Sequence, residues 1–376
     1  MRHLSIDNKY IKSLISIACV ICFIIIFRYN QNEDVLEVMS FEEDEIEDNY
    51  TILMQTLFDD RNKFILDGKE ENLKSLYETE KKFGLWAYEH EIQKMKYLKN
   101  WSKKQGVNFS NIKTKVHIRK VAKKEENLYG VICKVSTEYK YLYENQKDVE
   151  NMFRIGTYHY LNIKNIDGDW IIVKEWYTDP FADSLNLENI DSDEIKNYII
   201  SKQSKSINLT PELEKAVEYA HKYCGAAADE EDGLKFNLEY KDFNPDGGDC
   251  ANFASQIMFE SGRFKKNQTW NYKNQQATKA WVNAQGFKNY LIYSGRGSLI
   301  AKGSYSEIYK LAYNLSPGDI VGYEKNGRIT HVSTVTGQDS KGYPLVTCHN
   351  TDRKLVPWDL GWSNKSIRFH LIKVHY

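Results

Sequence analysis

The sequence predicts an α+β protein with an N-terminal transmembrane helix and two globular domains. Three observations support this prediction: an apolar run near the N-terminus, a change from helical to two-residue periodicity between residues 50 and 180, and a second helix start at Thr210-Pro211. A chain of 376 residues is long enough for two domains. The expected parts are a cytoplasmic tail and anchor (1–28), an acidic tether (29–49), an α+β domain (50–180), a linker (181–209) and a second α+β domain (210–376).

The N-terminal run extends from Leu14 to Phe27 and is interrupted only by Ser16. With the residues from Ile11 onward it is about the minimum length that spans a bilayer as a helix. No small-residue cleavage site follows it, which favours an uncleaved signal anchor over a signal peptide. Basic residues precede the run and acidic residues follow it. By the positive-inside rule, the sequence predicts a single-pass protein of the cell membrane whose bulk lies outside the cytoplasm.

The stretch 50–180 begins with helical spacing and ends with strands. Apolar residues recur every three or four positions from Ile52 to Trp101, and Gly106 fits the end of the last helix. Residues 116–173 alternate with period two, and Asp167-Gly168 predicts a hairpin. Helices packed on one curved antiparallel sheet are expected. This order resembles the nuclear-transport-factor-like fold, and the resemblance implies a pocket or a pairing face, so a protein partner of this domain is an expectation.

Charge and cysteine usage exclude several function classes. The net charge is −1, so nothing indicates nucleic-acid binding. The six cysteines show no paired or clustered spacing, which argues against a disulfide framework. Cys224, His221, Cys348 and His349 match no standard zinc pattern, so neither a metal nor a cofactor is expected.

The chemistry of the second domain centres on Cys250. It follows a turn that ends in Gly247-Gly248 and falls in the first turn of an amphipathic helix, with Gly262 just beyond that helix. A helix start favours a thiolate and offers N–H groups to an oxyanion, while the glycines leave room for a substrate backbone. We therefore predict that Cys250 is a nucleophile. The alternative is a small buried cysteine at a helix start.

A general base must come from elsewhere in the chain. Asn326-Gly327 closes a predicted hairpin, and His331 lies near the start of its return strand. The next strand ends near His349, Asn350 and Asp352, any of which could orient the ring of His331. His349 is the first choice for this third place, and the other two are fallbacks. A hydrogen-bonded strand histidine is the alternative reading of His331.

Four runs in this domain together resemble the family called Putative amidase domain, which belongs to the papain-like cysteine hydrolases. They are Gly-Gly-Asp-Cys-Ala-Asn-Phe-Ala-Ser-Gln (247–256), Pro-Gly-Asp-Ile-Val (317–321), His-Val-Ser-x-Val-x-Gly (331–337) and Cys-His-Asn-Thr-Asp (348–352). The resemblance covers residues 210–376. It implies a papain-like fold with Cys250 as nucleophile and His331 as base. The helper at the oxyanion has no unique counterpart, and Asn244, Gly248 and Asp249 are the residues near enough in sequence.

These inferences predict a membrane-anchored cysteine amidase or peptidase of a Gram-positive cell. Its expected substrate is peptidoglycan or a peptide, cleaved through a thioester on Cys250. Three alternatives remain open: a transpeptidase or protein-processing enzyme on the same fold, an inert or regulatory binding module of the cell envelope, and a structural role.

Overall fold

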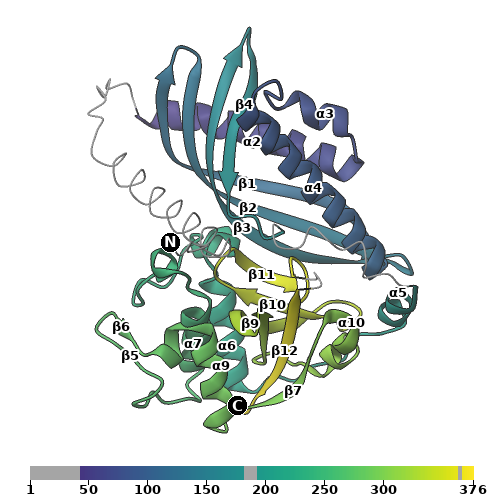
Figure 1. Cartoon of the computed structure of the whole chain (residues 1–376), viewed down its shortest axis with the longest axis vertical. Helices are drawn as coiled ribbons and strands as arrows, with labels where there is room; N and C mark the ends of the chain where they lie inside the picture. The colour runs from purple at the N-terminus through teal and green to yellow at the C-terminus, as the bar shows by residue number, and fades with distance from the viewer. Residues whose placement is uncertain (1–42, 182–192, 363–365) are drawn as a thin grey trace, which may run out of the picture. The chain divides into compact units, whose positions relative to one another are not determined.

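The computed structural model describes residues 43–181, 193–362 and 366–376 (Figure 1). The predicted anchor at residues 11–27 lies outside these ranges. Within them, no helix is both long enough and apolar enough to cross a membrane. The predicted acidic tether reaches residue 49, but the first described helix already begins at Glu43.

Three helices cover one face of an antiparallel sheet in the first half, as the sequence predicts (Figure 1). They are α2 (Glu43–Asp67), α3 (Glu70–Ser75) and α4 (Lys82–Gln105). Gly106 ends α4 with φ +72, a conformation that a residue without a Cβ adopts at little cost. Apolar side chains of α4, among them Met95, Leu98 and Trp101, pack on the sheet.

The sheet of the first half is built from four long strands joined in sequence. They are β1 (Val107–Glu125), β2 (Leu128–Tyr143), β3 (Gln146–Ile166) and β4 (Asp169–Tyr177). Asp167 and Gly168 form the β3–β4 turn, both with positive φ, so the hairpin prediction is confirmed. β1 begins nine residues before the first alternating residue that the sequence analysis recognised, Val116.

The second half contributes the remaining strands, with helices α6, α7 and α9 beside them (Figure 1). The strands are β8 (Ile320–Lys325), β9 (Arg328–Gln338), β10 (Pro344–Cys348), β11 (Asp352–Pro357), β12 (Ile367–Val374) and β7 (Gly297–Gly303). The helices are α6 (Pro211–Lys222), α7 (Cys250–Glu260) and α9 (Ala284–Tyr293). Thr210 caps α6, and Asn326-Gly327 closes the β8–β9 hairpin; both predictions are confirmed.

One sheet runs through both halves. Its strand order is β1-β2-β3-β11-β10-β9-β8-β12-β7, with β4 paired to β3 beside this path. The joint is an antiparallel pairing of residues 352–354 in β11 with residues 154–156 in β3. Gly156 lets the turn Gly225–Ala227 lie against this joint, because a Cβ at position 156 would lie 2.5 Å from Ala226. Residues 47–376 accordingly form one compact unit.

A buried ion pair and buried hydrogen bonds to carboxylates hold the two halves together. Lys104 of α4 and Asp359 of the second half form one, and Tyr343 donates a hydrogen bond of 2.7 Å to the same carboxylate. Tyr141 and Tyr143 of β2 donate to Asp339, which follows β9. A buried charge is costly without a partner, so these contacts favour the joined arrangement over separated halves.

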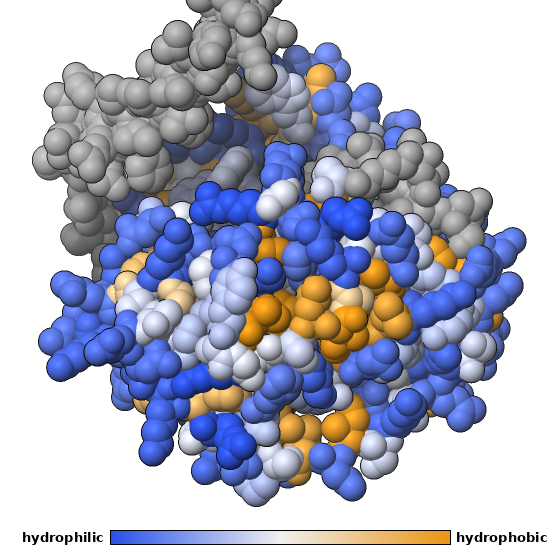
Figure 2. Space-filling view, turned by 60° about the horizontal axis from the view of Figure 1, so that its bottom comes forward, coloured by the Kyte–Doolittle hydropathy of each residue, from blue (hydrophilic) through white to orange (hydrophobic). Residues whose placement is uncertain are grey.

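The far edge of the sheet is a strand that the sequence analysis did not identify. Residues 297–303 form the edge strand β7, which pairs with β12. Glycines at positions 295, 297 and 303 obscure the strand pattern. Leu299 of β7 is 47% exposed. In Figure 2, a group of hydrophobic residues interrupts the hydrophilic surface of this half.

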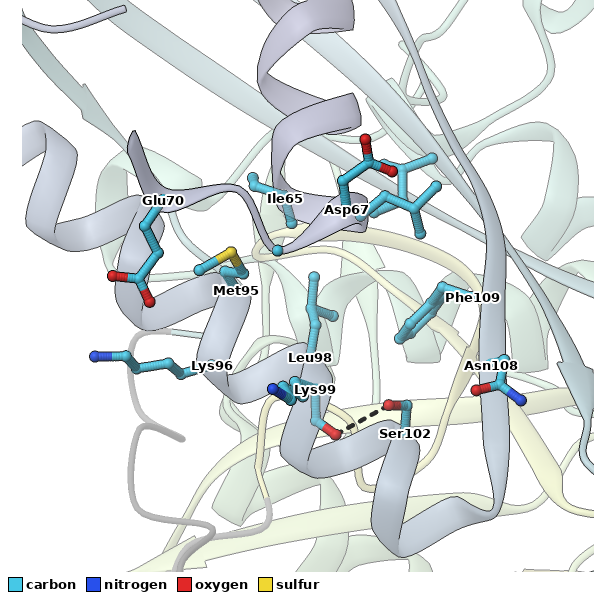
Figure 3. A pocket seen from close by; sticks show the side chains of 13 residues that line it. Ile65, Asp67, Glu70, Met95, Lys96, Leu98, Lys99, Ser102, Asn108 and Phe109 are labelled. Carbon is cyan, nitrogen blue, oxygen red and sulfur yellow. Dashed lines mark hydrogen bonds between the residues drawn. The ribbon is translucent and has the colours of Figure 1, made fainter. Parts of the chain in front are cut away.

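A pocket opens in the first half between the end of α2, α4 and the start of β1 (Figure 3). It has a volume of about 430 Å³. Leu98 and Phe109 point into it, and Lys96 and Glu70 lie at its rim. The resemblance to the nuclear-transport-factor-like fold stays a prediction.

Candidate active site

Cys250 is the first residue of α7, as the sequence predicts. Gly262, just beyond the helix, has φ +81 and fits the predicted stop. The helix packs on β9, and Cys250 belongs to the same apolar cluster as Val332 and Ala254. The thiol-bearing residue is only 7% exposed.

The protonation of Cys250 differs from the expectation. Burial raises the pKa of the Cys250 thiol to about 12, although the backbone N–H of Val332 acts in the opposite direction. The position at a helix start was expected to lower this pKa. In this structure the removal of the thiol from water outweighs the helix, so the resting form at neutral pH is the thiol.

His331 has no hydrogen bond to Cys250 in the described structure. Its Nε2 lies 3.4 Å from Cys348 Sγ and 3.3 Å from Ser333 Oγ, and its ring stacks on Trp362 at 5.0 Å. Alternation along β9 explains this placement. His331 and Ser333 share one face of the strand, whereas Val332, which packs with Cys250, faces the other side.

The environment of His331 keeps its ring neutral. Burial, assisted by the positive charge of Arg353, lowers the pKa of His331 to about 3. Arg353 itself is 1% exposed, and it donates to the Leu360 carbonyl at 2.6 Å. A neutral imidazole keeps the lone pair that a general base requires, but a pKa this low makes it a weak proton acceptor in this conformation.

His349 lies on the side of the strands that faces α7. Its ring stacks on Phe253 of that helix with 3.7 Å between centroids. Nδ1 is 2.6 Å from Asp249 Oδ2, and Nε2 is 2.8 Å from the Tyr223 carbonyl oxygen. The predicted contact with His331 is therefore not present. β9–β10 pairing explains why, because residues 347 and 334 are partners and Cys348, not His349, faces the side of His331.

The two acceptors around His349 define its charge. A neutral imidazole can donate from only one nitrogen, but here both nitrogens face oxygen atoms that accept. Burial alone would lower the pKa of His349, yet the contacts with Asp249 raise it above its usual value. His349 is thus held as an imidazolium paired with a carboxylate, and it has no lone pair with which to act as a base.

The residues predicted near an oxyanion have other partners. Asp249 Oδ1 accepts from the Phe243 N–H at 2.9 Å and from Asn252 Nδ2 at 2.8 Å. Because Oδ2 of Asp249 pairs with His349, both oxygens of this carboxylate have partners. The negative charge of Asp249 would also repel an oxyanion. Asn244 is exposed in the turn Asn244–Asp246.

Asn350 and Asp352, the two alternatives to His349 for orienting the ring of His331, have structural partners instead. The side-chain oxygen of Asn350 accepts from the Asp249 N–H. Gly248 has φ +134, and a Cβ there would lie 2.8 Å from Asn350 Nδ2. Asp352 accepts from the Ala226 N–H at 2.7 Å, and burial raises its pKa to about 6. Neither residue has a hydrogen bond to His331 in the described part of the chain.

Cys348 is the residue that the sequence analysis missed at this site. Its thiol makes the thiol–imidazole contact that the structure shows, with His331. Burial raises the pKa of Cys348 to about 11. The register of β9 against β10 would have identified it, but a single sequence does not supply that register.

Comparison with known proteins supports the hydrolase assignment. Residues 211–372 match the family described as Putative amidase domain. The match includes Cys250, His331 and His349 and indicates an amidase-like hydrolase. It leaves the first half of the chain outside.

Two further similarities are more limited. An uncharacterized protein, YjcM of Bacillus subtilis (strain 168), is 31% identical over 152 residues, which are 38% of this chain and 31% of that protein. The chain thus spans about a third of the length of this relative. The intermembrane space region of chloroplast protein ARC6 aligns with 34% of this chain and 95% of its own, at 7% identity and a TM-score of 0.24. A similarity at that level says nothing about function.

Proposed function

We propose that this chain is a membrane-anchored, extracytoplasmic cysteine amidase or peptidase that hydrolyses amide bonds of peptidoglycan. The observation that carries the proposal is Cys250 as the first residue of α7, inside the segment that matches the amidase family. The predicted anchor at residues 11–27 and the acidic stretch after it support a substrate outside the cytoplasm.

In the proposed reaction, Cys250 Sγ attacks the amide carbonyl carbon while its proton passes to His331. The tetrahedral intermediate collapses to a thioester, and the leaving amine takes the proton from His331. Water then hydrolyses the thioester, which regenerates the thiol and releases a carboxylic acid. Because the resting thiol is protonated, proton transfer has to accompany the attack.

His331 is the better candidate for the base, because its ring is neutral whereas both nitrogens of His349 are occupied. Because His331 and Val332 face opposite sides of β9, rotation of the ring alone does not bring it to Cys250, and the role requires a local shift of β9 or of the start of α7 when substrate binds. Catalytic contacts often form only in the substrate complex. His349 and Asp249 would act as positioning residues that fix the start of α7.

The direct test is a digest of purified peptidoglycan by the full-length chain, with mass analysis of the products. We expect new amine and carboxyl ends with the wild type and none with Cys250→Ser. Cys348→Ser is the matched variant, since it makes the same change in a second buried cysteine. If Cys250→Ser keeps full activity, the nucleophile assignment is wrong, and if only Cys348→Ser loses activity, the nucleophile is the thiol that contacts His331.

An inert or regulatory binding module is the second candidate. The raised pKa of Cys250 and the absence of a hydrogen bond between it and His331 in the described structure favour it. Alkylation by iodoacetamide near neutral pH separates the two functions. A Cys250 thiol that reacts faster than a free cysteine supports the enzyme, and one that reacts more slowly, with no product from peptidoglycan, supports the module.

A further inference from the structure

The outer face of the first sheet carries a site that the proposed function does not use. Along β2 and β3 the side chains alternate, so that Val131 and Leu161 are buried under the helices. Their neighbours Ile132 and Tyr160 point to the opposite face. Tyr160 is 46% exposed, and Trp176 of β4 is 59% exposed.

Strand register aligns these outer residues in two adjacent rows. The first row is Lys120–Ile132–Tyr160–Trp176, and the second is Ala122–Gly130–Asn162–Lys174. Directly opposite residues in antiparallel strands point the same way, so each row forms a continuous strip across four strands. Neither row contains a carboxylate.

A cavity of about 280 Å³ lies over these rows. We call it the lysine pocket, lined by Lys120, Lys124, Gly130, Tyr160, Asn162 and Lys174. Gly130 leaves room for the Lys124 side chain, because a Cβ at that position would lie 2.7 Å from Cε of Lys124. The amide of Asn162 offers both a donor and an acceptor at the floor.

The positive charge of the pocket is not neutralised from within the described chain. Among the described residues, no ion pair involves the exposed Lys120, Lys124 or Lys174. The ammonium of Lys174 lies 5.2 Å from the centre of the Phe83 ring, a contact that leaves its charge uncompensated by a carboxylate. The neighbouring outer rows add Lys134 and Lys164. Glu125 is the nearest carboxylate in register, and it lies in the same row as Lys164.

Tyr160 lines the pocket, and Trp176 packs against Tyr160 beside it. The rings of Tyr160 and Trp176 lie 5.6 Å apart, tilted by 47°. Their exposed surfaces suit a flat, weakly polar partner such as the C–H face of a sugar ring. Lysines beside aromatic rings therefore match a ligand that carries both negative charge and such a face.

We propose that the lysine pocket binds an acidic saccharide, as one unit of an anionic glycan chain. Carboxylates or phosphates of the glycan pair with Lys120, Lys124 and Lys174, and a sugar ring packs on Tyr160 and Trp176. A second copy of this chain is a poor occupant, because a two-fold contact would oppose like charges. The proposal goes beyond the amidase activity and does not depend on it.

The test is calorimetric titration of the full-length chain with a short hyaluronan oligosaccharide. We expect the triple variant K120Q/K124Q/K174Q to bind at least about tenfold more weakly and to lose most of the salt dependence. The control K63Q/K103Q/K147Q makes the same change in charge on exposed lysines outside both pockets, and it should bind like the wild type. Trp176→Ala should weaken saccharide binding about fivefold or more, yet leave binding of inorganic polyphosphate unchanged.

Several results would overturn the proposal. Equal binding of a neutral chitin oligosaccharide of the same length would remove the role of charge. Equal losses in the two triple variants would show that only net charge matters. The chain could also bind single-stranded DNA, or vesicles with anionic lipids, more tightly than the saccharide. If that binding depends on the three lysines, the pocket belongs to those partners. Circular dichroism of each variant checks that it is folded.

Discussion

His331 and His349 are eighteen positions apart, on or next to two neighbouring strands, yet their environments are opposite. His349 faces α7, with a carboxylate on one nitrogen and a carbonyl on the other, and its pKa is raised. His331 faces the other side of β9, between Cys348 and Trp362, and burial and Arg353 lower its pKa to about 3. The comparison shows that the groups around each ring, rather than its strand or its place in the sequence, decide which histidine can accept a proton.

The difference also separates two kinds of role. His349 has every polar atom engaged, which suits a residue that fixes the start of α7. His331 has a free-base ring beside weak donors, a thiol and a hydroxyl, which suits a residue that changes partner during a reaction. Substitutions at the two positions should therefore affect different measurements.

The largest effect is expected for His331 in catalysis. Replacing it with Gln removes the proton acceptor, so kcat for amide hydrolysis should fall by about 10²–10⁴-fold. The free energy of unfolding at pH 7 should change little, because the ring is neutral and Gln can still hydrogen bond. Activity and urea unfolding of the full-length chain are the measurements. A His331→Gln enzyme with wild-type kcat would show that His331 is not the base.

The next effect concerns stability and His349. Phe can retain the stacking on Phe253 but leaves the Asp249 carboxylate without its cationic partner, so His349→Phe should destabilise the fold by about 3 kcal/mol. The double variant with Asp249→Asn should recover part of this loss, since no buried charge is then unpaired. A double variant as unstable as the single one would show that the ion pair does not account for the effect.

The smallest effect is the pH dependence, which should have opposite signs at the two histidines. The pKa of His331 is about 3 in the folded chain against an unfolded value near 6.5, so its contribution to stability is lost as pH falls through this window. Between pH 7 and pH 5 the wild type should lose about 2 kcal/mol more than His331→Gln. The pKa of His349 is raised, so its contribution is complete below pH 6.5 and is lost as pH rises through the folded pKa.

Urea unfolding of the wild type and both variants across this pH range measures the two contributions. Subtracting the free energy of unfolding of each variant from that of the wild type at each pH removes the contributions of the other titrating groups. If the two contributions to the free energy of unfolding change in the same direction with pH, the pKa values of the two histidines are not shifted in opposite directions.

Local features of the fold could be predicted from the sequence. Thr210 at a helix start, the turns Asp167-Gly168 and Asn326-Gly327, and Cys250 at the start of α7 each depend on a few neighbouring residues. Such patterns act through the backbone of one segment, so one sequence is enough to recognise them.

Long-range features could not be predicted in this way. The face to which His331 and Cys348 point depends on the β9–β10 register, and a shift of one residue would reverse it. The pairing of Asp249 with His349 joins residues 100 positions apart. Burial, which governs the pKa of Cys250, arises only when α7 packs on the sheet.

The β3–β11 joint has a consequence for the order in which the chain is made. Residues 154–156 of β3 are synthesised almost 200 positions before their partners 352–354. β4 pairs only with residues 159–166 of β3, so this part of the edge stays open until the end of the second half emerges. An open strand edge is a template for pairing with other chains. The nascent first half should therefore be most prone to aggregation late in synthesis, and truncation before β11 should leave that edge permanently exposed.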